Sequence, residues 1–280
     1  MWYNELMAKD FEKTSSFSSD FVERWKAFWS KKQEQEPRGS SVGVCELSKA
    51  EVRGKAGESE DACFVDEEKQ IFAVFDGAGG EEGARLASQT AARTLAEITR
   101  DESVEIQNFT DLTWALNRIN RAVINEPDAG YSTGVIAKIS EGEEGKELHF
   151  VSVGDSRLYL VHGDKIEQIT TDDSVTETDL DRAGISDPVR RRAFLDHGIK
   201  RSLGPNFSVA YRNCGKRKVE GGDRLVLCSD GVTGDVEEDR MSEEEILGFL
   251  RENRDDEDAA RELVRGARKV DDRTAIVVTV

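Results

Sequence analysis

The residues best suited to chemistry in this chain are acids that flank apolar, strand-like runs. Four segments share this arrangement: IFAVFDGAGG with Asp76, HFVSVGDSR with Asp155, RLVLCSDGVTG with Asp230, and KVDDRTAIVV with Asp271 and Asp272. A further segment, SEDACFV, places Glu60 and Asp61 just before such a run. One Asp-Gly after a strand is usually a simple turn, because both residues tolerate the backbone angles of a turn. The repetition of an acid beside a strand-like run in several segments indicates a shared function in addition to turn formation.

Strands that end at one rim of a β-sandwich would bring these carboxylates within a few ångströms. Carboxylates so close together cannot all stay ionised unless a cation lies among them. Oxygen ligands favour Mg²⁺, Mn²⁺ or Ca²⁺, and with only 3 histidines in the chain a His-built zinc site is not expected. Two such ions about 3.5–4 Å apart activate a bound water and stabilise an in-line displacement at phosphorus.

Other phosphate-binding and nucleophilic motifs do not fit the sequence. Gly77-Ala78-Gly79-Gly80 is followed by Glu81 and Glu82, so the GxGxxG pattern is not met and the two acids would repel a pyrophosphate. The chain contains no GxxxxGK[ST] loop and no GxSxG nucleophile elbow. The aspartates therefore remain the main candidates for chemistry.

The elements that must position these acids follow from the hydrophobic pattern. Strands are expected at SVGVCEL, ACFV, IFAVF, STGVIAKI, ELHFVSV, RLYLVHG, KIEQIT, RLVLCS and TAIVVTV. Helices are expected near 82–98, 111–125 with Thr110 as N-cap, 242–252 with a Ser242–Glu245 capping box, and 257–268. Acids at 255–258 suit the N-terminus of the last of these helices. Clustered strands and paired helices predict an α+β fold, a β-sandwich flanked by helices.

The first 40 residues differ from the rest and are expected to form an N-terminal extension to a domain at 41–280. Phe21, Trp25 and Phe28 recur at helical spacing, which predicts an amphipathic aromatic helix. Two interpretations stay open: the helix packs on its own domain, or it docks a protein partner. EPRGSS at 36–41 is typical of a linker.

The composition of the chain limits its possible binding partners and its expected cellular location. The net charge of −18 makes binding to nucleic acid or to an anionic membrane unfavourable. The sequence shows neither a secretory signal nor an apolar run long enough to span a bilayer, so a cytoplasmic location is expected. The 4 cysteines form no CxxC pair and are expected to be buried free thiols.

The ordered set VFDGAGG, STGVIA, VGDSRLYL, IKRSLG, LCSDGVTG and DDRTAIVV resembles the metal-dependent protein phosphatases of the 2C type. The resemblance covers roughly residues 41–280. It implies a sandwich of two antiparallel sheets flanked by helix pairs. It also implies hydrolysis of phosphoserine and phosphothreonine on proteins, in which a hydroxide bridging two Mn²⁺ or Mg²⁺ ions attacks the phosphate directly.

The resemblance also assigns roles by motif. It implies that Asp76 bridges both metals, that the Gly77 carbonyl binds one, and that Asp230 and Asp271 bind the other. Glu60 is then expected to hold a metal-bound water, with Asp61 beside it. Asp155 corresponds to the residue that, with Asp230, holds a third metal ion in some members. Segment 172–200 corresponds to a flap beside the site and is a candidate for substrate selection.

Two positions depart from the family pattern. Ala78 stands where many members carry a general-acid histidine, so a metal-bound water must protonate the leaving oxygen, or the leaving group must need no acid. Ala56 stands where members often carry a phosphate-binding arginine. Lys55 and Arg53 are the candidate replacements, although lysine lacks the bidentate fork of arginine.

These departures leave three hypotheses. The first is a metal-dependent phosphoserine/phosphothreonine phosphatase that depends on Asp76, Asp230 and Asp271. The second is a 2C-like binding or regulatory module with weak or no catalysis, and the third is a phosphatase that acts on a small phosphoester. The presence of the central aspartates favours an enzyme.

Overall fold

The structure, a computed structural model, describes residues 41–47, 58–143 and 145–280. The expected aromatic helix, the linker and the candidate phosphate-binding residues Arg53 and Lys55 lie outside the described residues, as does Ala56. The domain boundary near residue 40 therefore stays a prediction. In the part of the chain that is described, each helix is too short or too polar to cross a bilayer.

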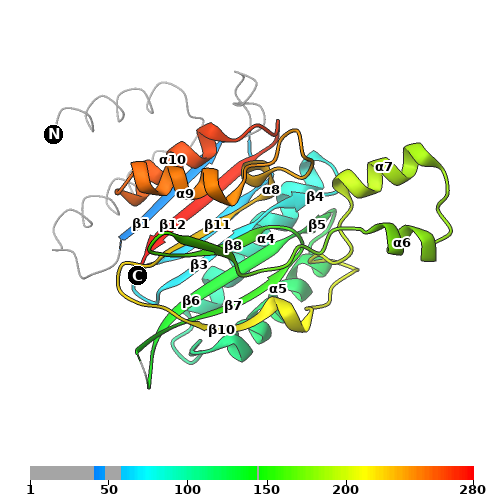
Figure 1. The fold of residues 1–280 in the computed structure, drawn as a ribbon. Coiled ribbons are helices and arrows are strands. Elements are labelled where there is room, and N and C mark those ends of the chain that lie inside the picture. The colour runs from blue at the N-terminus through cyan, green and yellow to red at the C-terminus, as the bar shows by residue number, and fades with distance from the viewer. Residues whose placement is uncertain (1–40, 48–57, 144) are drawn as a thin grey trace, which may run out of the picture. The chain divides into compact units, whose positions relative to one another are not determined.

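Two sheets form the centre of the fold (Figure 1). Neighbouring strands in both sheets are antiparallel. The first sheet contains, in spatial order, β1 Ser41–Leu47, β12 Arg273–Thr279, β11 Arg224–Cys228, β8 Arg157–His162 and β9 Lys165–Gln168. The second contains β10 Cys214–Lys218, β7 Gly145–Val153, β6 Gly134–Gly142, β3 Ile71–Phe75 and β2 Ala62–Asp66. A short ladder pairs β4 Gly77–Ala78 with β5 Tyr131–Ser132.

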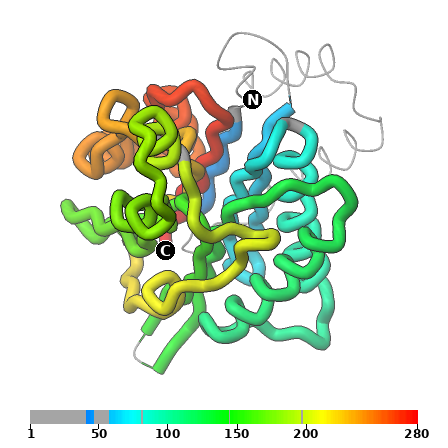
Figure 2. The backbone as a smooth tube through the Cα atoms, turned by 90° about the vertical axis from the view of Figure 1, so that its right-hand side faces the viewer, coloured from blue at the N-terminus to red at the C-terminus, as the bar shows by residue number. Residues whose placement is uncertain are grey.

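A pair of helices covers the outer face of each sheet. Figure 2 shows the two pairs on opposite sides of the strands. The second sheet is covered by α4 Glu81–Arg100 and α5 Phe109–Asn125, and the first by α9 Glu243–Glu252 and α10 Asp256–Gly266. The remaining helices are α6 Glu177–Arg182, α7 Pro188–His197, α8 Asp230–Thr233 and the 3₁₀ turn η1 Tyr211–Asn213. The predicted α+β sandwich flanked by helix pairs is confirmed.

Three apolar layers hold this arrangement together. Phe72 and Val74 of β3 point between the sheets, where they meet Ile276 of β12. Their chain neighbours Ile71 and Phe75 point the other way, toward α4 and α5. Since both faces of β3 are covered, all five of its residues are buried. This explains why its sequence is continuously apolar rather than alternating.

Of the two N-caps predicted from the sequence, one is confirmed by the structure and the other is wrong. The Ser242–Glu245 capping box is present at α9, where the Ser242 hydroxyl accepts from the Glu245 N–H. The predicted N-cap Thr110 is wrong, because α5 begins at Phe109 and Asn108 caps it in a box with Asp111. Asparagine caps as well as threonine does or better, and the phenylalanine between them obscured the earlier start.

Asp256 joins the last helix to the first sheet. Its carboxylate accepts from the Arg224 Nε at 2.9 Å, from the Ser41 hydroxyl at 2.5 Å and from the Thr279 N–H at 3.0 Å. Arg224 also donates to the carbonyls of Leu250 and Asn253 at the end of α9. Since the Asp256 side chain is 1% exposed, this network ties α9 and α10 to the strands in a buried site.

Removing the charge of Asp256 tests how much this network contributes to stability. Asp256→Asn should lower the free energy of unfolding by about 3 kcal/mol, because the buried Arg224 guanidinium then lacks its counter-charge. Urea unfolding monitored by circular dichroism measures this difference. The matched control is Glu257→Gln, whose carboxylate pairs with Arg261 but is 57% exposed; it should change stability by less than about 1 kcal/mol. Equal effects of the two variants would contradict the role given to Asp256.

Candidate metal centre

The acidic strand ends named from the sequence meet at one end of the sandwich. Asp76 follows β3, Asp155 follows β7, and Asp230 follows β11. Asp61 precedes β2 and Asp271 precedes β12. The Asp76, Asp155 and Asp230 carboxyls are close enough to perturb one another electrostatically, and Asp61 acts on Asp76 in the same way. The predicted convergence of carboxylates is therefore present.

Ser229 links three of these strand ends. Its backbone N–H donates to the Thr274 carbonyl at 3.1 Å, and its hydroxyl accepts from the Thr274 N–H at 3.1 Å. The same hydroxyl donates to Asp61 Oδ2 at 2.7 Å. One buried serine thus fixes the end of β11, the start of β12 and the start of β2 relative to one another.

Asp76 is held through its backbone. Its N–H donates to the Thr133 hydroxyl at 3.0 Å, and its carbonyl accepts from the Thr133 N–H at 2.8 Å. The Thr133 hydroxyl lies 2.6 Å from the hydroxyl of Ser156, next to Asp155. These contacts leave the Asp76 carboxyl group available to the site while its backbone is fixed on both sides.

Two glycines are required where the site loops approach other backbone. A Cβ on Gly77 would lie 2.3 Å from the Ala84 carbonyl oxygen, inside α4. A Cβ on Gly231 would lie 1.8 Å from the Asp272 carbonyl oxygen. Neither contact is sterically tolerable. The glycines at 77 and 231 are therefore needed because the chain passes close to other backbone there, and not only because it turns.

The carboxylates of the centre are strongly perturbed. Burial, together with the neighbouring carboxylate charges, raises the pKa of Asp76 and of Asp155 well above the usual range. Burial, together with the nearby charges of Asp230 and Asp272, raises the pKa of Asp61 to about 8, although the hydrogen bond from Ser229 acts in the opposite direction. These are the shifts expected when several carboxyl groups share a site that lacks sufficient positive charge.

Asp230 behaves differently because a lysine neutralises it. Burial raises its pKa, but the charge of Lys269 and its hydrogen bond outweigh burial, so the pKa of Asp230 lies below its ordinary value. The Lys269 ammonium lies 2.6 Å from Asp230 Oδ2 and 3.1 Å from Asp271 Oδ2. Asp271 therefore belongs to the same cluster as Asp230.

Asp235 is a member of the centre that sequence analysis missed. Its carboxylate, with those of Asp155 and Asp230, can place one oxygen each within 4.8 Å of the others. It arrives there because Gly234 ends α8 with φ of 71°, a conformation natural to glycine, and turns the chain back. Burial and the charge of Asp230 raise the pKa of Asp235 to about 6. The sequence signal was the acid that follows Gly234.

The residues present fit a divalent cation with a preference for oxygen. The buried Oδ1 atom of Asp155 has no hydrogen-bond partner among the described residues, and such an atom is costly unless a cation or proton meets it. The surrounding donors are carboxylates, which are hard ligands suited to Mn²⁺ and Mg²⁺.

Glu60 and Asp272 lie at the edge of this cluster. The Glu60 N–H donates to Asp272 Oδ2 at 2.9 Å, and the Glu60 carbonyl accepts from the Ser88 hydroxyl at 2.5 Å. Asp272 thereby connects the segment before β2 to the start of β12. The predicted substrate-binding residues Arg53 and Lys55 are outside the described residues, so their role stays a prediction.

Comparison with known proteins decides the family. The sequence model of the protein phosphatase 2C family matches residues 53–265. The chain belongs to this family. Its phosphatase 2C fold is also found in the crystal structure of the catalytic domain of the serine/threonine protein phosphatase PstP with two manganese ions. That likeness has a TM-score of 0.62 and 26% identity, and it covers 86% of this chain and 97% of the other.

Two relatives show how far the similarity extends. The serine/threonine protein phosphatase PstP of Mycobacterium tuberculosis is 31% identical over 207 residues, which cover 69% of this chain and 36% of that protein. The serine/threonine phosphatase stp of Listeria innocua is 29% identical over 214 residues, which cover 69% of this chain and 78% of that protein. This phosphatase 2C chain thus spans about a third of the mycobacterial protein.

In this phosphatase 2C chain, the segment expected to form a flap, residues 172–200, begins beside the carboxylates. Asp173 donates its N–H to the Gly154 carbonyl, next to Asp155, and its carbonyl accepts from the Lys200 N–H. The Asp173 carboxylate pairs with Arg201. Both ends of the segment are therefore attached close to the site, while α6 and α7 project from the sandwich (Figure 1).

The raised pKa values predict how metal binding depends on pH. Without metal, the folded chain binds protons that the unfolded chain has released, because the pKa values of Asp235 and Asp61 rise to about 6 and about 8. The stability of the metal-free chain therefore falls as pH rises through this range. Since Mg²⁺ replaces those protons, the increase in melting temperature caused by Mg²⁺ should grow from pH 6 to pH 8.

Differential scanning fluorimetry with Mg²⁺ and with chelator at each pH measures this increase. Asp76→Asn serves as the control and should show a smaller increase at every pH. An Mg²⁺ effect that is constant or declines from pH 6 to pH 8 would contradict the assignment of these pKa values to the metal centre.

Proposed function

We propose that this chain is a metal-dependent protein phosphatase that hydrolyses phosphoserine and phosphothreonine. The observation that carries the proposal is the convergence of Asp61, Asp76, Asp155, Asp230 and Asp271 at the strand ends of a phosphatase 2C fold. Carboxylates with this spacing need cations. The names of the relatives, which are serine/threonine phosphatases, support the substrate class.

The proposed metals are two Mn²⁺ or Mg²⁺ ions, with a third more weakly held. Asp76 is assigned to both of the first two, the Gly77 carbonyl to one, and Asp230 and Asp271 to the other. Glu60 and Asp61 are assigned to bound water. Asp155 with Asp230 is assigned to the third ion, and we add Asp235 to this set because of its position.

The chemistry divides between the ions and the chain. When bound, the metal ions supply an activated water and stabilise the charge that develops at phosphorus. The chain supplies rigidity: Thr133 fixes the backbone of Asp76, and Ser229 fixes the loops of Asp61 and Asp230. Ala78 has no proton to donate, so this position cannot act as the general acid. Substrates with a good leaving group should therefore be hydrolysed most readily.

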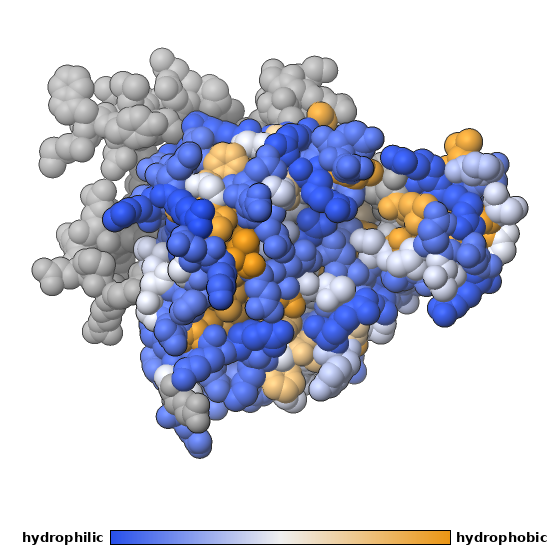
Figure 3. Space-filling model, in the orientation of Figure 1, coloured by the Kyte–Doolittle hydropathy of each residue, from blue (hydrophilic) through white to orange (hydrophobic). Residues whose placement is uncertain are grey.

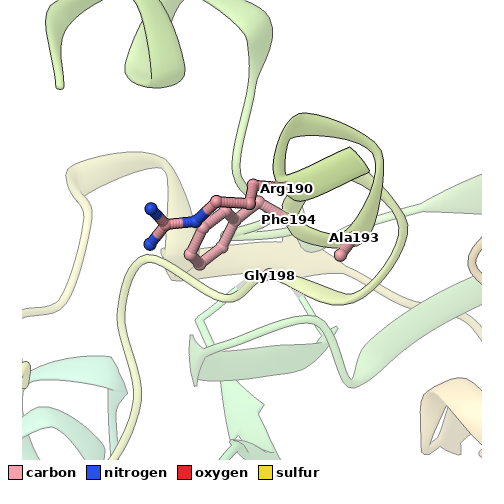
Figure 4. Close-up of a pocket in the computed structure, with 4 residues that line it drawn as sticks. All are labelled: Arg190, Ala193, Phe194 and Gly198. Atoms are coloured by element: carbon pink, nitrogen blue, oxygen red, sulfur yellow. The ribbon is translucent and has the colours of Figure 1, made fainter. Parts of the chain in front are cut away.

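The flap offers a surface for a protein substrate. A cavity of about 420 Å³ is lined by Arg190, Ala193, Phe194 and Gly198. Arg190 and Phe194 project from the same side of α7 (Figure 4). Apolar patches on the projecting helices stand out from a mostly hydrophilic face in Figure 3, in agreement with Val189 at 78% and Phe194 at 40% exposure. An arginine beside apolar surface suits a phosphopeptide better than a small phosphoester.

Further parts of the proposal concern location and partners. We place the protein in the cytoplasm and expect it to avoid nucleic acid and membranes, in keeping with its net charge of −18. The aromatic helix predicted in residues 1–40 is proposed to pack on the domain or to dock a partner. A pull-down with and without residues 1–40 separates these two roles.

Hydrolysis of p-nitrophenyl phosphate tests the proposal directly. The wild type should be active with Mn²⁺ and inactive with chelator, and Asp76→Asn and Asp230→Asn should each lower kcat by at least about 100-fold, because a metal ligand is lost. Asp164→Asn is the matched control, since this exposed aspartate pairs only with Arg251 on the surface in the described structure. It should retain wild-type activity.

The pattern of results separates the hypotheses. Activity that persists in Asp76→Asn, or that needs no metal, would overturn the proposed centre. A folded wild type without activity on any phosphoester would favour the binding module. Activity on p-nitrophenyl phosphate and on a small phosphoester, without activity on phosphoserine peptides, would contradict only the proposed protein substrate. The assignment as a metal-dependent phosphatase would stand.

A further inference from the structure

Lys269 places a positive charge inside the carboxylate cluster. Its Nζ atom lies 2.6 Å from Asp230 Oδ2, 2.8 Å from Asp235 Oδ2 and 3.1 Å from Asp271 Oδ2. Only 11% of its side chain is exposed. An ammonium group has three N–H donors, and each here has a carboxylate oxygen within reach. Lys269 thus meets three carboxylates in the way a bound cation would.

The oxygens that Lys269 contacts are those that the proposed metal centre requires. Asp230 and Asp271 are assigned to one metal ion, and Asp235 adjoins the third site. The side chain of Lys269 ends in an ammonium group, and its contacts with three carboxylates partly neutralise their charge. A metal ion and an ammonium group cannot share these oxygens without strong repulsion, because both charges would lie a few ångströms apart in a poorly solvated site.

Metal binding can move the side chain of Lys269 out of the carboxylate cluster, but not its backbone. Its carbonyl accepts two hydrogen bonds from Arg273, from Nε at 3.1 Å and from Nη2 at 2.6 Å. These bonds fix the backbone of residue 269 two positions before Asp271. The four-carbon stem is flexible, so the ammonium can leave the cluster by rotation of the side chain while the backbone stays in place.

We propose that Lys269 is a built-in competitor of the metal ion assigned to Asp230 and Asp271. Its ammonium group holds these carboxylates together when metal is absent, and metal binding displaces it. The consequence is a lower affinity for metal and a folded, stable metal-free form. This inference rests on the proposed metal centre and adds to it a residue that sets the metal concentration at which the centre fills.

Metal affinity of a charge-removing variant provides the test. In isothermal titration calorimetry with Mn²⁺ on the full chain, Lys269→Met should bind at least about tenfold more tightly than wild type, a difference of about 1.4 kcal/mol. Lys269→Arg keeps the charge and should not gain affinity. Lys216→Met is the matched control, because Lys216, which lies on β10, pairs with Glu147 of β7 and contacts none of the centre's carboxylates in the described structure. An unchanged or weaker affinity in Lys269→Met would overturn the proposal.

Thermal stability gives a readout that does not depend on turnover. Without metal, Lys269→Met should melt at a lower temperature than wild type, because three carboxylates lose their counter-charge; with saturating Mg²⁺ the two should melt at similar temperatures. A Lys269→Met chain that is as stable as wild type in chelator would overturn the role of the ammonium group.

Direct observation of the ammonium covers the case in which Lys269→Met fails to fold. A slowly exchanging ¹⁵Nζ signal, identified by its absence in Lys269→Arg, should be present in chelator and lost on saturation with Mg²⁺. A signal that persists unchanged with bound Mg²⁺ would overturn displacement. If wild type binds neither Mn²⁺ nor Mg²⁺, the metal centre itself fails. If wild type binds metal and Lys269→Met binds it no more tightly, only the role of Lys269 fails.

Discussion

Buried carboxylates that lie within a few ångströms repel one another, and the fold holds them together against that repulsion. Every strand that delivers an acid is hydrogen-bonded within a sheet, and both faces of the central strand β3 are packed. Ser229 and Thr133 then fix the loops that follow, through backbone as well as side-chain hydrogen bonds. The rigidity of the sandwich is therefore what makes a dense cluster of negative charge attainable.

Glycine recurs at the rim because backbone segments approach one another closely there. Gly77 and Gly231 follow the acids directly, and a side chain at either position would collide with neighbouring backbone, in α4 for Gly77 and just before β12 for Gly231. Close backbone approach is the condition for bringing acids from five separate segments into one site. The metal ions proposed for this site would relieve the repulsion, and in their absence Lys269 provides part of the compensating charge.

Much of this arrangement could be predicted from local pattern. Runs such as IFAVF and TAIVVTV predict buried strands. The acids at their ends predict a carboxylate cluster at one rim of the sandwich, because strand ends in a sandwich converge. The capping box at Ser242 depends on residues three apart, so it was also within reach of sequence. The ordered motifs further implied the family, which the comparison of residues 53–265 bears out.

Long-range contacts lay beyond sequence analysis. Asp256 looked like one of several acids at a helix start, yet it is buried against Arg224, 32 residues earlier in the chain. Lys269 and Asp235 carried no motif, and only the turn at Gly234 and the approach of the two loops bring them together. These contacts depend on how separate loops pack against one another, which the hydrophobic periodicity of the chain does not predict.

The most direct test of the central claim is to count the Mn²⁺ ions that the chain binds. Electron paramagnetic resonance of free Mn²⁺ during a titration gives this number without reference to any substrate. We expect at least two ions per chain at saturation, and fewer in Asp76→Asn, which loses the carboxylate that we assign to both ions. A wild-type chain that is folded and leaves all Mn²⁺ free in solution would contradict the account.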